Sequence, residues 1–162
     1  MAVEIRAARP EEYAETGIVT ADAYREFFSA TDLASYLDEV ADVEGRAPRT
    51  TILVAVDGDR IIGSATLELD GRTDEDAEPL RPDEAHIRML GVLPDARGAG
   101  VGTQLMTECE ARARTAGRTR MTLHTTTRMR AAREMYMSMG YERTEDRVYP
   151  DGFVLLGYTK PL

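Results

Sequence analysis

Apolar positions along the chain follow two different periods. Alternating apolar and polar positions, or short β-branched runs, predict strands, and apolar residues three or four positions apart predict helices. We expect strands at residues 3–7, 51–56, 61–69, 85–92, 120–125, 141–143 and 153–159. Helical spacing covers residues 10–28, 33–40, 105–116 and 129–139. This order indicates one domain over residues 1–162, with a mixed α/β sheet and helices on its faces.

Composition places the chain among globular proteins. Hydrophobic residues make up 43% of the 162 positions and charged residues 30%, which is ordinary for one domain with its own core. No apolar run approaches the roughly 20 residues that a membrane-spanning helix needs, so we expect no membrane partner. The first residues lack the apolar core of a signal peptide, and we therefore expect a cytoplasmic protein.

Charge and side-chain chemistry argue against several kinds of site. The formal net charge of −9 argues against a nucleic acid as partner. Seven arginines lie between residues 112 and 133, whereas residues 70–84 are mostly acidic. These segments could face an anion and a cation, or both could be solvated surfaces. With one cysteine, Cys109, and two histidines, His86 and His124, we expect no disulfide and no metal site.

Three glycines lie where a predicted strand gives way to a helix. Gly98, Gly100 and Gly102 follow Arg97, and unpaired backbone N–H groups at a helix start can hold a phosphate that approaches closely. A dinucleotide fingerprint would need glycine where Thr103 stands. A P-loop would need a lysine, and the chain has none before residue 160. The segment therefore predicts a phosphate cradle that follows neither nucleotide motif.

This segment resembles the acyl-CoA motif of the GNAT superfamily of N-acyltransferases. Arg97, Gly100 and Gly102 match its arginine and glycine positions and follow Val92 and Pro94, as in the family. A second family segment is matched by Ala132, Met135, Tyr136, Gly140 and Tyr141. The resemblance implies a GNAT-like fold, with a mostly antiparallel sheet of six to seven strands whose central strands splay apart. It also implies acetyl-CoA as co-substrate.

The resemblance also assigns residues to the cofactor. The backbone of Leu90, Gly91 and Val92 would pair with the pantetheine arm like an added strand, and Gly91 is expected to mark a bulge. Arg97 would add positive charge beside the pyrophosphate. The N–H groups that would hold the pyrophosphate belong to Gly98, Ala99, Gly100, Val101, Gly102 and Thr103.

The resemblance is weaker at the far end of the cofactor. Arg128, Arg130 and Arg133 are candidates for the 3′-phosphate of CoA, with solvated helix arginines as the alternative. Met129 stands where the family often has asparagine, and the chain contains no asparagine at all. A contact that such an asparagine makes elsewhere is therefore not expected here.

Two side chains are candidates for proton transfer. His86 occupies a strand position where the family often has its general base, and the nearby charge of Arg88 would keep its imidazole neutral. Glu84, two residues earlier on the same face, is the reserve base, and a strand histidine without a role is the alternative. Tyr136 matches the family tyrosine that protonates the leaving thiolate, although it could simply pack. We expect Cys109 in the core and His124 in a structural or solvent-facing role.

The expected function is transfer of an acetyl group from acetyl-CoA to a primary amine, directly within a ternary complex. The acceptor is a small-molecule amine or a peptide amine, and the acidic segment from Asp74 to Glu84 favours a positively charged one. If the acceptor were instead anionic, Arg88 would bind its carboxylate. The alternatives are an acyl-CoA-binding sensor or scaffold without catalysis, and a protein N-terminal or lysine acetyltransferase. The sequence leaves a homodimer open.

Overall fold

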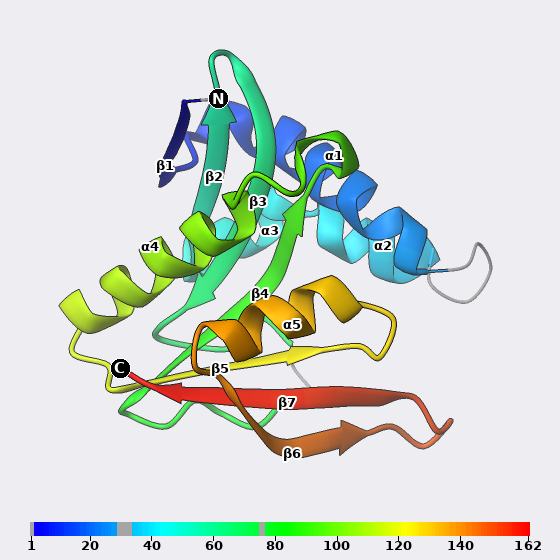
Figure 1. Cartoon of the computed structure of the whole chain (residues 1–162), viewed down its shortest axis with the longest axis vertical. Helices are drawn as coiled ribbons and strands as arrows, with labels where there is room; N and C mark the ends of the chain where they lie inside the picture. Colours follow the sequence, from blue (N-terminus) through cyan, green and yellow to red (C-terminus); the bar gives the residue numbers. More distant parts are fainter. Residues whose placement is uncertain (1, 29–33, 75–76) are drawn as a thin grey trace.

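The chain folds into a seven-stranded mixed sheet with helices on both faces (Figure 1). The computed structural model describes residues 2–28, 34–74 and 77–162. The strands are β1 Val3–Ala7, β2 Thr51–Asp57, β3 Arg60–Glu68, β4 Glu84–Val92, β5 Arg120–Thr125, β6 Glu142–Val148 and β7 Val154–Pro161. Their order across the sheet is β1-β2-β3-β4-β5-β7-β6, and every neighbouring pair is antiparallel except β4 and β5.

Within the described residues, five α-helices accompany this sheet. They are α1 Tyr13–Tyr24, α2 Ala34–Ala41, α3 Val43–Arg46, α4 Val101–Thr115 and α5 Arg130–Ser138. Short 3-10 turns occupy η1 Pro10–Glu12, η2 Arg25–Phe27, η3 Ala47–Arg49 and η4 Pro94–Ala96. None of the helices in the described ranges is long and apolar enough to cross a membrane.

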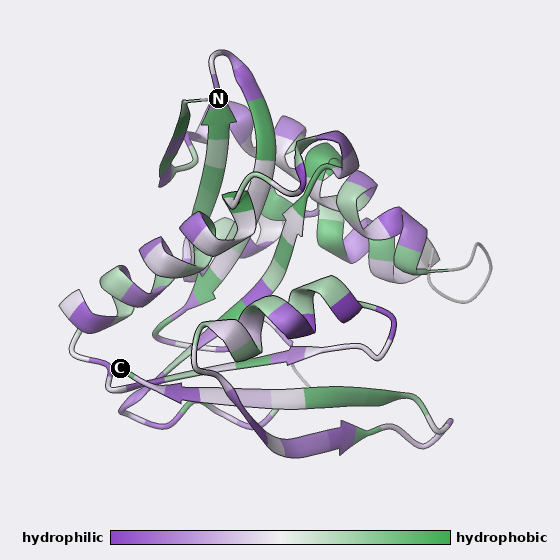
Figure 2. Ribbon diagram, viewed as in Figure 1, coloured by the Kyte–Doolittle hydropathy of each residue, from purple (hydrophilic) through white to green (hydrophobic). Residues whose placement is uncertain are grey.

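The two faces of the sheet carry different helices. Leu53 of β2 packs in one core cluster with Leu105 of α4 and Tyr136 of α5. The next residue, Val54, packs in another cluster with Val19 of α1. Because successive strand residues point to opposite faces, α4 and α5 cover one face and α1 covers the other. In Figure 2 the hydrophobic colour concentrates on β2 and β3, whereas the edge strand β6 is mainly hydrophilic.

The predicted fold class is confirmed, and the elements differ from expectation mainly at their ends. The hairpin expected at Asp57 to Arg60 joins β2 to β3. The closing strand expected at residues 141–143 is longer and becomes β6, whose mostly exposed residues give no apolar alternation. The helix expected to start at Pro10 begins as a 3-10 turn and becomes α-helical at Tyr13. Leu33, expected in a helix, lies outside the described residues.

The central strands splay apart, as the resemblance implied. β4 pairs with β5 only from Glu84 to Ile87, whereas it stays paired with β3 up to Val92. In Figure 1, β4 rises toward α1 while β5 runs toward the side of the molecule where β7 begins. Beyond Ile87, therefore, the edge of β4 that faces β5 has no strand partner among the described residues.

A bulge lies at the start of this splayed segment, but not at the expected residue. Between Arg88 and Gly91, β4 has two residues where β3 has only Ala65. Met89, within the bulge, has a φ of +55°, which is rare for a residue other than glycine. Gly91 follows the bulge and has a different reason to be glycine. A Cβ atom there would lie 3.0 Å from the Cβ of Ala23 on α1.

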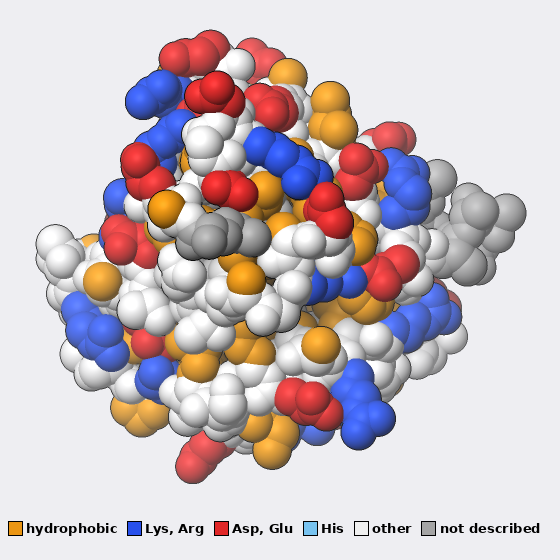
Figure 3. Space-filling model, turned by 45° about the horizontal axis from the view of Figure 1, so that its top comes forward, with side chains coloured by type: hydrophobic (Ala, Val, Ile, Leu, Met, Phe, Trp, Pro, Cys, Tyr) orange, Lys and Arg blue, Asp and Glu red, His pale blue; other side chains and the backbone are white. Residues whose placement is uncertain are grey.

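Ion pairs in the folded chain balance the uneven charge of the sequence. Arg118 from the arginine-rich region pairs with Asp70 at 3.1 Å, so the basic and acidic segments meet. Arg112 pairs with Glu108 at 2.9 Å along α4. Acidic and basic side chains are accordingly intermixed over the face shown in Figure 3. Such exposed pairs stabilise the fold only slightly, because solvent screens them.

Candidate active site

The three glycines at the start of α4 serve two different purposes. Gly98 and Gly100 have φ values of +85° and +81°, which side-chain-bearing residues rarely adopt, and a Cβ atom on either would point into open space. Gly102 is already helical, and a Cβ atom there would lie 3.2 Å from the sulfur of Met135 on α5. The first two glycines therefore shape the turn, and the third allows α5 to pack closely.

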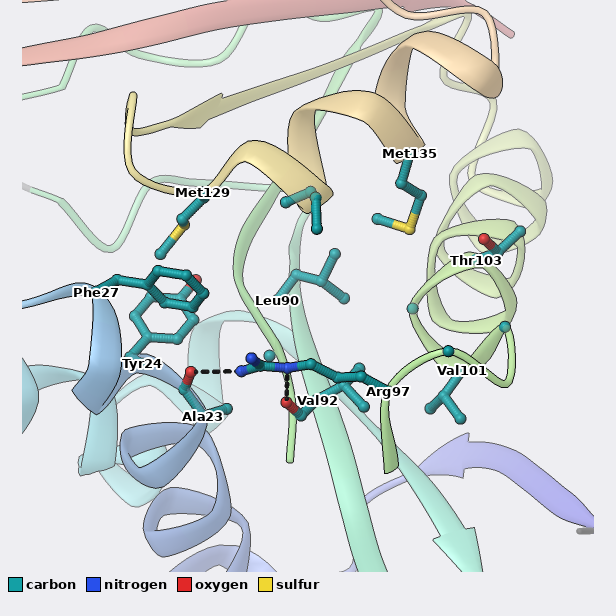
Figure 4. A pocket seen from close by; sticks show the side chains of 16 residues that line it. Ala23, Tyr24, Phe27, Leu90, Val92, Arg97, Val101, Thr103, Met129 and Met135 are labelled. Carbon is teal, nitrogen blue, oxygen red and sulfur yellow. Dashed lines mark hydrogen bonds between the residues drawn. The ribbon is translucent and has the colours of Figure 1, made fainter. Parts of the chain in front are cut away.

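The turn opens onto a cavity of about 290 Å³, which we call the glycine cleft (Figure 4). It lies between α1, the splayed end of β4, the start of α4 and the start of α5. Its lining residues are Ala23, Tyr24, Phe27, Leu90, Gly91, Val92, Arg97, Gly98, Gly100, Val101, Gly102, Thr103, Met129, Ala131, Ala132 and Met135. The cleft thus brings together the predicted cofactor-binding residues, with the exception of Ala99, which is not among those lining it.

Two sets of backbone groups in the cleft are available to a ligand. The N–H of Gln104 donates to the carbonyl of Gly100 at 3.0 Å, which is the first helical hydrogen bond of α4. The N–H groups of Val101, Gly102 and Thr103 come before it and have no helical acceptor. The splayed edge of β4 adds strand-type donors and acceptors. The cleft therefore suits an elongated ligand with an anionic end at the helix start.

Arg97 contacts the far wall of the cleft instead of the helix start. Its guanidinium donates to the carbonyl oxygens of Val92 and Ala23, each at 3.0 Å (Figure 4). It also pairs with the carboxylate of Glu26 and stacks on the ring of Phe27, 5.5 Å from its centroid. In this structure Arg97 bridges β4 and α1 across the cleft, and its expected role beside a phosphate stays a prediction.

The other predicted arginines lie outside the residues that line the cleft. Arg128 donates to the carbonyl of Phe27 at 3.1 Å, and Arg133 donates to that of Thr127 at 3.1 Å. Arg130 is exposed and pairs with Glu134. Each has a partner within the protein, and a contact with the 3′-phosphate remains a hypothesis.

A second cavity, of about 260 Å³, also has Tyr24 in its lining, and we call it the histidine pocket. Its lining residues are Tyr24, Phe28, Tyr36, Arg72, Asp74, His86, Arg88, Met89, His124, Thr126, Arg147, Tyr149, Phe153 and Leu155. Tyr24 also lines the glycine cleft. The two cavities therefore adjoin at Tyr24, which lines both of them.

His86 is buried in the wall of the histidine pocket. Its Nδ1 atom lies 2.7 Å from the hydroxyl oxygen of Thr122, and its ring centroid lies 5.5 Å from that of His124. Burial lowers the pKa of His86 well below its ordinary value, and the Arg72 guanidinium adds to this effect. His86 is therefore neutral at pH 7, as a general base must be. The expected contribution of Arg88 is present but smaller.

Glu84, the reserve base, does not line the histidine pocket. It accepts a hydrogen bond from the Thr122 hydroxyl at 2.6 Å, so it reaches His86 only through that residue. His124, expected to be structural or solvent-facing, lies closer to the site than the sequence indicated, since it lines the histidine pocket.

Tyr136 lies beside the glycine cleft without lining it. Its ring packs against Tyr141 and Tyr158, with centroids 6.0 and 5.9 Å away, and only 5% of its surface is exposed. Burial raises the pKa of the Tyr136 phenol, which keeps its proton at neutral pH. Cys109 is fully buried nearby, and burial raises the pKa of its thiol to about 12. The expected core position of Cys109 is therefore confirmed.

Two residues that line or support the site were not singled out from the sequence. Tyr24 ends α1 far from any motif, and Thr122 is one of two threonines on β5. Only strand pairing reveals Thr122, because β5 places it opposite His86 in the register. Met129, at the position where the family often has asparagine, lines the cleft and accepts a contact from the Thr125 hydroxyl at 3.4 Å.

Solved structures that are similar to this chain include acetyltransferases. The PaiA N-acetyltransferase of Thermoplasma acidophilum, solved with coenzyme A, has a TM-score of 0.77, 17% identity and coverage of 100% of both chains. YncA of Salmonella typhimurium, solved with acetyl-CoA, has a TM-score of 0.73 and 17% identity, and the match covers 100% of this chain and 95% of that one. The ribosomal-protein-S18-alanine N-acetyltransferase of Escherichia coli has a TM-score of 0.73 and 16% identity, and the match covers 99% of this chain and 94% of that one.

Sequence comparison gives the family directly. No curated protein sequence matches the chain. The model of the acetyltransferase (GNAT) family matches residues 18–141, which include the second half of α1, the glycine turn, His86 and Tyr136. The chain therefore belongs to the GNAT family of acetyltransferases.

Proposed function

We propose that this protein transfers an acetyl group from acetyl-CoA to the nitrogen of a primary amine, within a complex that holds both. The observation that carries the proposal is that two cavities adjoin at Tyr24. One is a cleft with backbone donors at a helix start, and the other is a pocket lined by a neutral histidine. The experiment that tests it is a thiol-release assay, in which free CoA is measured with acetyl-CoA and a panel of amines.

The residues of the glycine cleft fit acetyl-CoA. The splayed edge of β4 at Leu90 to Val92 would pair with the amides of the pantetheine arm, as an added strand does. Gly98 and Gly100 leave open space above the start of α4, where a pyrophosphate can approach the backbone. Two solved structures of the same fold hold acetyl-CoA and CoA. Acetyl-CoA would supply the acetyl group as an activated thioester.

His86 would take the amine proton. An ammonium group has no lone pair with which to attack, so the amine must lose a proton before or during transfer. Since burial keeps His86 uncharged, its imidazole can accept that proton at neutral pH. The pocket that it lines is where an amine would enter.

Tyr136 would protonate the leaving sulfur, and Tyr136→Phe tests this role. The substitution keeps the ring that packs against Tyr141 and Tyr158 and removes only the hydroxyl. We expect kcat to fall by about 10- to 100-fold, because a positioned acid contributes on this order. The melting temperature and the Kd for acetyl-CoA should stay close to those of the unsubstituted protein. Full turnover in the variant, with chemistry shown to limit the rate, would make Tyr136 a packing residue.

Glu26→Gln is expected to tighten the binding of acetyl-CoA. Glu26 holds the Arg97 guanidinium on the α1 side of the cleft and places a negative charge near the entry of an anionic ligand. The pair is partly exposed, so its release is worth roughly 0.2–1 kcal/mol, or up to about fivefold in Kd. Titration calorimetry at two salt concentrations measures this. A weaker Kd would show that the bridge to Glu26 supports the cleft.

The histidine pocket favours an acceptor with an aromatic or other apolar body. Tyr24, Phe28 and Tyr36 form one wall, with ring centroids 5.2 to 6.4 Å apart. Of the acidic segment, Asp74 lines the pocket and pairs with Arg147 at 2.7 Å, whereas Glu75 and Asp76 lie outside the described residues. The positive charge expected of the acceptor therefore has weak support from the described part of the pocket.

We expect arylalkylamines to be better acceptors than polyamines. A polyamine keeps a second ammonium group after deprotonation. Burying it beside Arg88 and Arg147 is costly, because the described carboxylates there, Glu39 and Asp74, already pair with these arginines. A difference of at least about 10-fold in kcat/KM should separate the two classes. Equal or better rates with polyamines would restore the expectation of a cationic acceptor.

A peptide amine is the second candidate acceptor. A polar groove of about 420 Å³ shares Arg72, His124 and Arg147 with the histidine pocket and could extend the site for a longer chain. One solved structure of this fold is the ribosomal-protein-S18-alanine N-acetyltransferase of Escherichia coli. The same assay with short peptides decides between the two acceptor types.

A further inference from the structure

A chain of polar contacts links His86 to a carboxylate outside the histidine pocket. Nδ1 of His86 lies 2.7 Å from Oγ1 of Thr122, and this oxygen lies 2.6 Å from Oε2 of Glu84. We propose that Thr122 and Glu84 are positioning residues that hold the neutral His86 ring with its proton on Nδ1. The proposal rests on the proposed function, in which His86 is the general base.

The contacts of Glu84 fix the direction of each hydrogen bond. Its Oε1 atom accepts from the backbone N–H of Arg81 at 3.0 Å, and its Oε2 atom faces the Thr122 hydroxyl. An ionised carboxylate can only accept, so the single hydroxyl proton of Thr122 points to Glu84. The lone pairs of the Thr122 oxygen then face His86, and Nδ1 must donate to them. A neutral imidazole with its proton on Nδ1 carries its free lone pair on Nε2.

The surroundings of His86 leave that lone pair available. No hydrogen bond to Nε2 is formed within residues 2–28, 34–74 and 77–162. Glu68, opposite His86 on β3, is occupied by the backbone N–H and hydroxyl of Thr73 and by Arg72. The charged and titratable groups around the pocket and its backing strands include Tyr24, Tyr36, Glu39, Glu68, Arg72, Asp74, Glu84, Arg88, His124, Arg147 and Tyr149. Among the contacts that His86 itself makes, the one to Thr122 sets the proton position.

The same series of hydrogen bonds would assist His86 during the reaction. When Nε2 takes the amine proton, the ring becomes an imidazolium with a positive charge. The hydrogen bond from Nδ1 to Thr122, backed by the Glu84 carboxylate, favours this charged form. Glu84 thus acts through Thr122 and does not itself touch the amine. Thr122→Val would remove the acceptor for Nδ1 and let the proton move to Nε2, which blocks the base.

Nuclear magnetic resonance can test the proton position without any acceptor. The chain has two histidines, so long-range proton–nitrogen correlation spectra of ¹⁵N-labelled protein, assigned with His124→Gln, resolve the His86 ring. We expect protonated Nδ1 and unprotonated Nε2 in the unsubstituted protein at pH 7. Thr122→Ser should keep this form and Thr122→Val should lose it. Thr159→Val, which removes a hydroxyl from the neighbouring position on β7, is the matched control and should not alter it.

Kinetics supply the second arm. Thr122→Val should lower kcat by about 10-fold with little change in KM for acetyl-CoA, and shift the acid limb of the pH profile downward. Thr122→Ser should recover kcat to within about twofold of the unsubstituted protein. If the valine variant fails to fold, Glu84→Ala should give a mixture of both ring forms.

Two results would overturn the proposal. One is a proton on Nε2 in the unsubstituted protein, and the other is an unchanged ring form and pH profile in Thr122→Val. Absence of turnover in the unsubstituted protein as well as in the variants would count against the proposed function alone, because the ring form is measured without an acceptor.

Discussion

Replacing Gly100 with valine is expected to abolish measurable binding of acetyl-CoA. Gly100 has a φ of +81° at the residue that caps α4, a conformation that is strained for a β-branched side chain. A valine would also place its methyl groups in the open space where the pyrophosphate must approach the backbone. Titration calorimetry should show a Kd at least about 100-fold weaker than that of the unsubstituted protein, or more than about 2.7 kcal/mol of lost binding free energy.

Gly117→Val is the matched control for this experiment. Gly117 ends the same helix with a φ of +80° and likewise has open space beside it. The control should cost a similar amount of folding stability, measured by thermal denaturation, and leave the Kd for acetyl-CoA unchanged. Micromolar binding that survives in Gly100→Val would remove the start of α4 from the binding site.

His86→Ala is expected to lower kcat by about 100-fold or more, because a positioned general base contributes about 10²–10⁴ to the rate. His86 lines the histidine pocket and not the glycine cleft, so the Kd for acetyl-CoA should stay the same. Calorimetry with acetyl-CoA therefore serves as the folding and binding control. An unchanged kcat would shift attention to Glu84, the other candidate base.

The lowered pKa of His86 also predicts the direction in which the acid limb of the pH–rate profile is shifted. Burial lowers the pKa of His86, so its neutral form persists below the ordinary histidine value of about 6.5. The rate should rise with pH through the folded-state pKa, and its acid limb should therefore lie below pH 6.5. In His86→Ala this limb should disappear. A profile that is identical in both proteins would contradict the role of His86 as base.

The sequence predicted the glycine cleft well because the chemistry there is local. A left-handed turn followed at once by a helix start needs glycine at fixed positions, and Gly98 and Gly100 occupy them. The order of strands and helices was equally accessible, since periodicity reports which face of each element is buried. The sequence predicts too short a strand at β6, because the residues from Glu142 to Val148 are mostly exposed and show no apolar alternation.

Features that depend on packing between distant segments could not be predicted. The bulge was expected at Gly91, but it lies at Met89 and Leu90, where β4 leaves β5. Gly91 is small because α1 packs against it, which no local pattern reports. The contact between Thr122 and His86 depends on the parallel register of β4 and β5, and the strand sequences alone do not determine this register.

Tyr136 and Arg97 show that a family motif can locate a residue without predicting its contacts. The motif located both residues, but not their contacts. Tyr136 packs in the aromatic core beside the cleft, and Arg97 bridges to α1 through Glu26 and Ala23. The contacts of Arg97 depend on α1 and η2, and that of Tyr136 with Tyr158 depends on β7, and these elements lie outside the two motif segments.

Direct transfer of the acetyl group is tested by following a labelled acetyl group. The purified protein is incubated with acetyl-CoA that carries carbon-13 in the acetyl group, together with arylalkylamines, polyamines and short peptides. The masses of all products and of the protein are then measured by mass spectrometry. The account predicts labelled acetyl on the nitrogen of an amine, one free CoA for each product, and no label on the protein. Binding of acetyl-CoA without an acetylated product from any acceptor, or label retained on Cys109, would contradict it.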